Sequence, residues 1–266
     1  MFKKSLPLIV SALFCFCGGC AVNPISGEGQ LMLLSEEQDL AIGRQYSREI
    51  EKEMGGAIPD TILQNYVNGV GQKVGAVSHR PDLEYQFTAL EDKTVNAFAL
   101  PGGYIFITRG MLECLETESQ LAAIISHEIV HVVARHASEA MSREIGIDIL
   151  FSLVVPEDTS KGILTTVDLT RQIIGLRYSR DDEREGDIAG MDYMVRAGYD
   201  PYGMIETMEM LERQEKVRGI EFLSTHPSPE NRVSYLRDNI ELRYPDTSLL
   251  RIGREDYSRN VLSRLR

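Results

Sequence analysis

Five consecutive residues carry the most specific chemical pattern in the chain: residues 127–131 read HEIVH. In a helix, positions four apart lie on one face, so His127 and His131 point the same way and can share one metal ion. Glu128 lies one step round, close enough to reach a water on that metal. The pattern is typical of a zinc site that activates water, because it supplies two ligands and a general base together.

The neighbouring residues place this pattern in the interior of the protein. Residues 121–134 read LAAIISHEIVHVVA, so Ser126 is the only other polar side chain. A helix that is apolar nearly all round belongs in a core, where three ionisable groups are costly unless something satisfies them. A divalent cation would satisfy them. The alternative is a core helix whose histidines bond to backbone groups or water.

One helix, expected from residue 117 to about Met141, must carry these residues. Thr117 and Gln120 have capping-box spacing, and Glu116 and Glu118 place negative charge where the helix dipole favours it. On this helix His136 falls five residues after His131, so we expect it to point elsewhere. Neither His136 nor His79 is assigned a ligand role.

The order of the other predicted elements is helices, a small sheet, then helices, which is an α+β layout. Helices are expected over residues 35–54, 61–77, 165–197, 201–217 and 229–242, and strands within residues 84–108, with a turn at residues 101–103. The apolar stretch 145–155 is too short to span a membrane. It is either a buried helix or a flap over the site.

Length and charge limit the classes of protein. A chain of 266 residues can bury one full core, and we expect a single domain over residues 35–266. The net charge of −12 argues against nucleic acid as a partner and against electrostatic attachment to anionic lipid.

The first twenty residues read as a targeting segment. Two lysines precede an apolar run that ends in Gly18-Gly19-Cys20, which is the order of a secretory signal peptide. The end resembles the lipobox of bacterial lipoproteins, although Cys17 stands where Leu is usual. We therefore expect a signal peptide over residues 1–19, an acylated Cys20 and an irregular, lipidated lead-in over residues 20–34. The alternatives are ordinary cleavage nearby and an uncleaved anchor.

Cysteine use fits this interpretation. Cys15 and Cys17 would leave with the signal peptide and Cys20 would carry lipid, so only Cys114 would remain and no intramolecular disulfide could form. We expect Cys114 to be a small hydrophobic residue of the core.

A catalytic zinc usually takes a third protein ligand and keeps one position for water. Candidate acids lie in residues 178–187, which read YSRDDEREGD, although on spacing alone each could belong to a solvated helix face. HEIVH followed about fifty residues later by SRDDEREGD resembles the HtpX-like and CAAX-prenyl-protease-like family of zinc metallopeptidases, whose second motif is SRxxExEAD. The resemblance implies that Glu183 binds zinc and that Asp187 orients a ligand histidine. Gly186 replaces the motif's Ala, and we expect the ligand assignment to survive this change.

Two further stretches resemble the same family. Residues 96–103, NAFALPGG, are similar to its NAFxxPGG segment, a strand beside the active site to which a peptide could add. The alternative is an internal hairpin. The substrate-binding residues would be Asn96, Ala97, Phe98 and Ala99.

His226 and Arg232 match the family's HPxxxxR element. The resemblance implies that His226 lies near the zinc, where it either steadies the transition state or caps the metal in a shut form. It also makes Arg232 the expected partner for developing oxyanion charge.

The resemblance covers roughly residues 22–240 and is nearest to periplasmic, lipoprotein-type and BepA-like members. It implies a mostly helical, zincin-like (gluzincin) domain with a small sheet beside the active-site helix and one Zn²⁺ per chain. The implied activity is an endopeptidase of protein quality control, acting on unfolded or misassembled envelope proteins. Its implied place is the periplasm of a bacterial cell envelope, with a lipid anchor in the outer membrane.

One feature departs from the BepA-like members, which carry tetratricopeptide repeats after this domain. The present chain stops at Arg266, so partner recognition through such repeats is not expected. Two other functions remain open at this point. One is a non-catalytic zinc-containing lipoprotein that binds or chaperones envelope proteins, and the other is a zinc hydrolase of a different bond.

Overall fold

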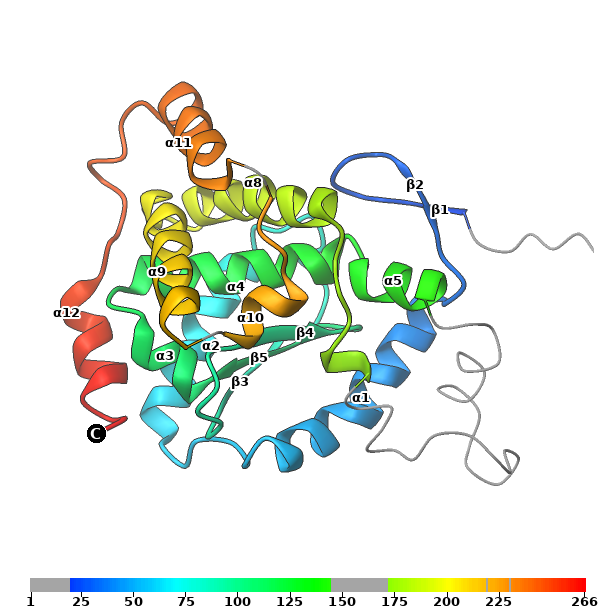
Figure 1. Ribbon diagram of the computed structural model, residues 1–266, viewed down its shortest axis with the longest axis horizontal. Helices are drawn as coiled ribbons and strands as arrows, with labels where there is room; N and C mark the ends of the chain where they lie inside the picture. The colour runs from blue at the N-terminus through cyan, green and yellow to red at the C-terminus, as the bar shows by residue number, and fades with distance from the viewer. Residues whose placement is uncertain (1–19, 145–171, 219, 230) are drawn as a thin grey trace, which may run out of the picture.

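The computed structural model describes residues 20–144, 172–218, 220–229 and 231–266. The expected signal peptide and the apolar stretch 145–155 lie outside the described residues. The elements in chain order are β1 (Cys20–Val22), β2 (Gly29–Leu31), α1 (Glu36–Glu53), α2 (Thr61–Gly75), β3 (Gln86–Leu90), β4 (Ala97–Leu100), β5 (Tyr104–Thr108), α3 (Arg109–Cys114), α4 (Glu118–Val133), α5 (His136–Glu144), α8 (Arg180–Arg196), α9 (Tyr202–Arg218), α10 (Glu221–Thr225), α11 (Arg232–Arg243), α12 (Arg254–Tyr257) and the π-helical η2 (Ser258–Leu262). The predicted α+β, mostly helical class is confirmed (Figure 1).

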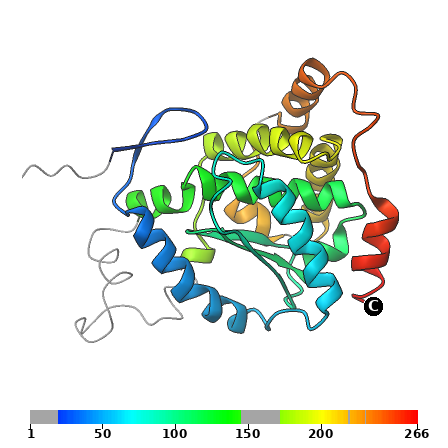
Figure 2. The ribbon, with the colours of Figure 1, turned by 180° about the vertical axis from the view of Figure 1, so that it is seen from behind.

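A three-stranded sheet separates two cores. Its order is β3-β5-β4, with β3 parallel and β4 antiparallel to β5, so β4 is an edge strand. Side chains alternate along each strand. Ala97 and Ala99 face the larger core, which holds α2 and α4, whereas Phe98 and Leu100 face a second core with α1 and α5. Figure 2 shows α1 and α2 from behind.

Helix α4 is the central element, and all of its residues are buried. It runs beside α8 and also packs against α2 and α9 (Figure 1). Its start was correctly predicted: Thr117 caps the helix by accepting a hydrogen bond from the Gln120 N–H, and the Gln120 side chain accepts one from the Glu116 N–H. Burial on every side follows from its nearly unbroken apolar sequence.

The predicted extent of this helix was wrong. It ends at Val133 instead of Met141, and Arg135 adopts a left-handed φ of 59° before α5 begins. A left-handed backbone is uncommon for a residue other than glycine, and two hydrogen bonds from the Arg135 side chain offset its energetic cost. Its Nε donates to Asp39 Oδ2 at 2.6 Å and its Nη2 donates to the Leu34 carbonyl at 2.7 Å.

Three other expectations need correction. The helix expected over residues 165–197 is not continuous in the described residues: 172–174 are helical, 175–179 are not, and α8 begins at Arg180, where Ser179 and Asp182 form a capping box. The lead-in expected to be irregular contains an antiparallel hairpin of β1 and β2. The last expected helix begins at Arg232, and α10 lies in a stretch for which no helix was expected.

No helix in the described ranges has both the length and the apolar character that crossing a membrane requires. The β1–β2 hairpin lies at the opposite end of the molecule from α12, as both overall views show.

Candidate active site

Four side chains from three separate segments gather at the centre of the molecule. His127 and His131 come from α4, Glu183 from the first turn of α8, and His226 from the residue that ends α10. One donor atom of each lies within 4.8 Å of the others. The helix periodicity of the HEIVH pattern thus places both histidines on one face, as expected.

The spacing of these donor atoms fits a zinc-sized cation. The Nε2 atoms of His127 and His131 are 3.0 Å apart, and each lies 3.4 Å from a carboxylate oxygen of Glu183. Ligands at the Zn–N and Zn–O distances common in proteins form a tetrahedron with edges of about 3.3 Å. Two imidazoles and one carboxylate are also a donor set that zinc accepts.

His226 fills the fourth position of the cluster. Its Nδ1 lies 2.9 Å from Glu183 Oε1 and 3.4 Å from His127 Nε2. Its ring stacks on Phe222 with centroids 4.4 Å apart. His226 thus lies beside the other three residues, and whether it steadies the transition state or caps the metal stays a prediction.

Glu128 lies beside the cluster without a hydrogen-bond partner. Both of its oxygens are buried and unbonded among the described residues, and its Oε1 is 3.7 Å from His226 Nε2. Burial raises the pKa of the Glu128 carboxyl, and the nearby charges of His226 and His127 oppose this shift only in part. A buried, unpaired carboxylate is costly, which is why such groups often mark a functional site.

Burial and neighbouring charges shift the pKa values of the other residues of the cluster. Burial alone would raise the pKa of Glu183, but the positive charges of His226 and His127 hold it well below its usual range. Burial alone would lower the pKa of His127, but Glu183 and Asp187 raise it to about 9. Burial dominates at His131, whose pKa falls well below the usual value. Glu183 therefore stays ionised and His131 neutral, the states that bind a metal.

Asp187 and Arg232 form a second layer around the ligands. Asp187 Oδ1 lies 3.2 Å from His127 Nδ1, where it can orient that ring. Arg232 donates to Asp187 from Nε at 2.7 Å and from Nη2 at 2.5 Å, and Tyr235 also donates to this carboxylate. The Arg232 Nη2 lies 3.4 Å from Glu183 as well. Two of its three nitrogens are thus engaged, and its oxyanion role stays a prediction.

Two residues of the site were not predicted from the sequence. The Tyr178 ring stacks on the His131 ring with centroids 4.0 Å apart. His136 Nδ1 lies 2.8 Å from His131 Nδ1, so the expectation that His136 points elsewhere was wrong. The expectation assumed one continuous helix, whereas the turn at Arg135 brings His136 back onto His131. Tyr178 directly precedes the SRDDE motif, which was its only signal in the sequence.

The proposed substrate strand lies next to the cluster. β4 holds Ala97, Phe98 and Ala99 at the edge of the sheet and packs against α4, and a small cavity there is lined by Ala99, His131 and Tyr178. All three strand residues are buried. The Asn96 side chain is also buried, and its amide atoms have no partner within the described ranges. The edge position is compatible with strand addition, but the binding role itself stays a prediction.

Comparison with known proteins gives a consistent picture. The model of the family described as Peptidase family M48 matches residues 61–240, which include all four residues of the cluster. The chain is 28% identical over 242 residues to the beta-barrel assembly-enhancing protease of Escherichia coli strain K12, covering 86% of this chain and 49% of that protein.

Two other relatives are similar to a comparable degree. The beta-barrel assembly-enhancing protease of Yersinia pestis is 28% identical over 224 residues, or 80% of this chain and 46% of that protein. The mitochondrial metalloendopeptidase OMA1 of Schizosaccharomyces pombe is 30% identical over 222 residues, or 81% of this chain and 65% of that protein. The chain spans about half the length of its bacterial relatives.

Proposed function

Because the chain belongs to peptidase family M48, we propose that it is a zinc-dependent endopeptidase of the bacterial cell envelope that acts in protein quality control. The observation that carries the proposal is the buried cluster of two histidines and Glu183 with an unpaired carboxylate, Glu128, beside it. A purely structural metal site needs no base, so Glu128 favours catalysis over the non-catalytic alternative.

Each residue then has a defined role in peptide hydrolysis. His127, His131 and Glu183 hold the zinc ion, which when bound acidifies water and polarises a carbonyl group. Glu128 takes the proton of the attacking water and passes it to the leaving amine. His226 Nε2 has no partner among the described residues and can donate to the developing oxyanion. Arg232 steadies Asp187 and Glu183 and adds positive charge near that oxyanion.

The arrangement corresponds to a shut form of the enzyme. His127, Glu128, Glu183 and His226 have no exposed surface, and His131 is 1% exposed. A polypeptide cannot reach donor atoms that water does not touch. We propose that the His226 ring leaves the fourth position of the cluster when substrate enters but stays close enough for its Nε2 to donate to the oxyanion. We also propose that the substrate adds to the edge of β4 through main-chain hydrogen bonds.

The proposed location and substrates rest on two supports. The relatives include both bacterial and mitochondrial proteins, so their names do not decide between compartments. The leader that ends at Cys20 favours a periplasmic protein, cleaved after residue 19 and anchored to the outer membrane by lipid on that cysteine. Unfolded or misassembled envelope proteins are proposed as substrates because the E. coli relative is named for beta-barrel assembly.

The test compares the zinc content and activity of four forms of the full mature chain on an unfolded, fluorescently labelled protein. We expect wild type to bind one zinc ion, Glu128→Gln to keep the zinc and lose turnover, and Glu183→Ala to lose the zinc. Faster cleavage by His226→Ala than by wild type would favour capping of the metal by His226, and slower cleavage would favour its role as a donor to the oxyanion.

Two results would contradict specific assignments. Wild-type turnover by Glu128→Gln would remove Glu128 as the base, and full zinc content in Glu183→Ala would remove Glu183 as a ligand. If His226→Ala and wild type both bind unfolded protein without cleaving it, the non-catalytic alternative holds. Cross-linking of Glu128→Gln in envelope extracts would then identify the bound proteins in either case.

A further inference from the structure

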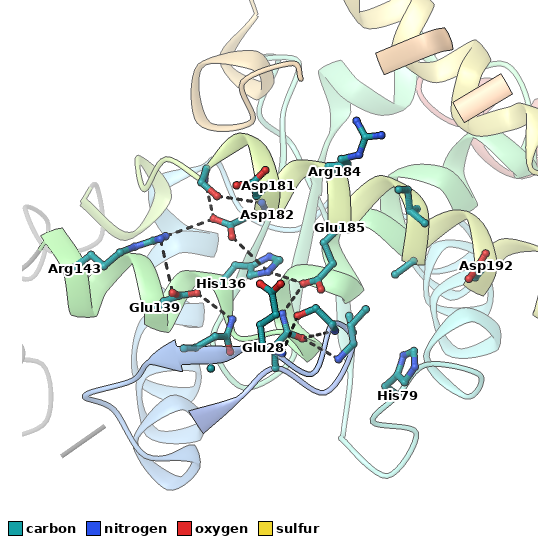
Figure 3. A pocket seen from close by; sticks show the side chains of 18 residues that line it. Glu28, His79, His136, Glu139, Arg143, Asp181, Asp182, Arg184, Glu185 and Asp192 are labelled. Carbon is teal, nitrogen blue, oxygen red and sulfur yellow. Dashed lines mark hydrogen bonds and ion pairs between the residues drawn. The ribbon is translucent and has the colours of Figure 1, made fainter. Parts of the chain in front are cut away.

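A chain of hydrogen bonds leads from a proposed metal ligand to the surface of the molecule. His131 Nδ1 lies 2.8 Å from His136 Nδ1, and His136 Nε2 lies 3.0 Å from Glu185 Oε2. His136 is 1% exposed, so water does not compete for these contacts. Figure 3 shows the His136 ring pointing toward Glu185 across the wall of a cavity of about 820 Å³.

Only one arrangement of protons satisfies this chain when a metal is bound. His131 faces the cluster with Nε2, which must offer its lone pair to the metal, so the proton of its neutral ring is on Nδ1. That N–H donates to His136 Nδ1, which must therefore be the acceptor. The proton of His136 is then on Nε2 and donates to the carboxylate of Glu185.

The far end of this chain of hydrogen bonds, at Glu185, is fixed by the β1–β2 hairpin. Asn23 lies in the connection between the two strands, and its Nδ2 donates to Glu185 Oε2 at 2.7 Å. Asn23 is itself held, because its Oδ1 accepts from the Ile25 N–H at 2.8 Å. The second carboxylate near His136 is Asp182, at 3.7 Å, beyond hydrogen-bond distance.

The hairpin also stabilises the turn between α4 and α5 that positions His136. Gln30 of β2 donates from Nε2 to the Ala134 carbonyl and to Glu139 Oε2, both at 3.0 Å. The first contact satisfies a carbonyl at the end of α4, and the second reaches α5. The left-handed Arg135 lies between these two points. The hairpin therefore holds both sides of the turn that brings His136 onto His131.

We propose that His136 is a positioning residue for the metal ligand His131, and that Glu185 and Asn23 fix its ring and its proton. The inference rests on the proposed function, because it requires a metal at His131. A ligand histidine held in this way keeps its ring orientation and is a stronger base, and losing such support typically weakens metal binding about 10- to 100-fold.

The test measures zinc affinity of the full mature chain by competition with a chromophoric chelator. His136→Ala should bind zinc 10- to 100-fold more weakly than wild type. His136→Asn should recover part of the loss, because an amide oxygen can still accept from His131 Nδ1. Glu185→Gln keeps a hydrogen-bond acceptor but removes the charge, so we expect a smaller loss, and a larger one for Glu185→Ala.

His79→Ala is the matched control. His79 lines the same cavity, but it contacts Tyr193 and no residue of the metal cluster. Its zinc affinity should equal that of wild type. The visible absorption of the cobalt-substituted protein separates positioning from general destabilisation. His136→Ala should shift the cobalt bands, whereas the control should leave them unchanged.

The outcomes distinguish this inference from the proposed function. If wild type binds no zinc, the proposed function fails. If wild type binds zinc and His136→Ala binds it equally well with unchanged cobalt bands, only the positioning role is overturned. Should His136→Ala not fold, the two Glu185 variants decide, and wild-type affinity in both would overturn the inference.

Discussion

The absence of a side chain at Gly186 determines how closely α8 approaches a metal ligand. A Cβ at this position would lie 2.7 Å from His127 Cε1 and 2.9 Å from its Nδ1, which is closer than real contacts allow. The family motif has Ala here. The sequence predicts that this change leaves Glu183 as a ligand. In the structure, the His127 ring occupies the space that a Cβ at residue 186 would need.

Gly186→Ala should therefore weaken metal binding and lower stability together. Adding a methyl group to a packed core typically costs about 1–3 kcal/mol, which exceeds the gain of at most about 1 kcal/mol from replacing glycine by alanine in a helix. Zinc affinity should fall by about tenfold, because the His127 ring must move. Gly69→Ala in α2, where nothing lies within 4 Å of the new Cβ, is the control with unchanged zinc affinity.

The raised pKa of His127 predicts that metal binding releases a proton. In the metal-free protein Glu183 and Asp187 raise this pKa to about 9, above the ordinary histidine value. The resulting charge interaction stabilises the fold below about pH 6.5 and is lost as the pH rises through 9. Zinc must displace the same proton, so its apparent affinity should increase from pH 7 to pH 9.

Calorimetry in two buffers of different ionisation enthalpy measures that proton directly. We expect about one proton released per zinc ion near pH 7.5. Equal heats in both buffers would mean that His127 is already neutral in the metal-free protein.

Among the elements, α8 depends on its first turn for both stability and function. Ser179 accepts from the Asp182 N–H at 3.1 Å, and Asp182 accepts from the Ser179 N–H at 2.8 Å. Glu183 follows directly in the chain. Removal of a serine cap typically costs about 1 kcal/mol.

Ser179→Ala should thus lower the free energy of unfolding by about 1 kcal/mol in a urea titration. It should also weaken zinc binding, since fraying at this end displaces Glu183. Ser47→Ala is the control, because Ser47 is half-buried in the middle of α1 and caps no helix, and the stability of this variant should match wild type. A stable Ser179→Ala protein with weakened zinc binding would separate the two effects.

The starts of several helices could be predicted from the sequence, whereas the end of α4 could not. Caps such as Ser35, Asp60 and Thr117 are local signals, and the structure confirms all three helix starts. The end of α4 had no such signal, because Arg135 is neither Gly nor Pro. Its left-handed backbone is stabilised by Asp39 and Leu34, which lie about a hundred residues earlier in the chain. The periodicity of a single segment cannot reveal contacts of that kind.

The same distinction applies to the site. Helix spacing alone placed His127 and His131 together, whereas Glu183 and His226 required a resemblance between motifs. The structure brings all four together. His136 and Tyr178 were missed because their contacts with His131 depend on where two helices begin and end.

In the whole molecule, the metal cluster joins segments that are otherwise separate in the chain. α4, α8 and the end of α10 each contribute donor atoms. A ligand that binds only the folded state stabilises it by about 4 kcal/mol at a thousand times its Kd. Removing zinc with a chelator should therefore lower the Tm by about 10 °C, and returning zinc should restore it. An unchanged Tm would show that no metal is bound.

The burial of the cluster has a consequence for the kinetics of inhibition. Because the residues of the cluster are at most 1% exposed, an active-site inhibitor can bind only after the same opening that a substrate requires. Raising the inhibitor concentration would then speed the onset of inhibition only up to a plateau. The rate constant for onset at that plateau equals the opening rate. Slow-onset inhibition would therefore measure how fast His226 moves, without any structural probe.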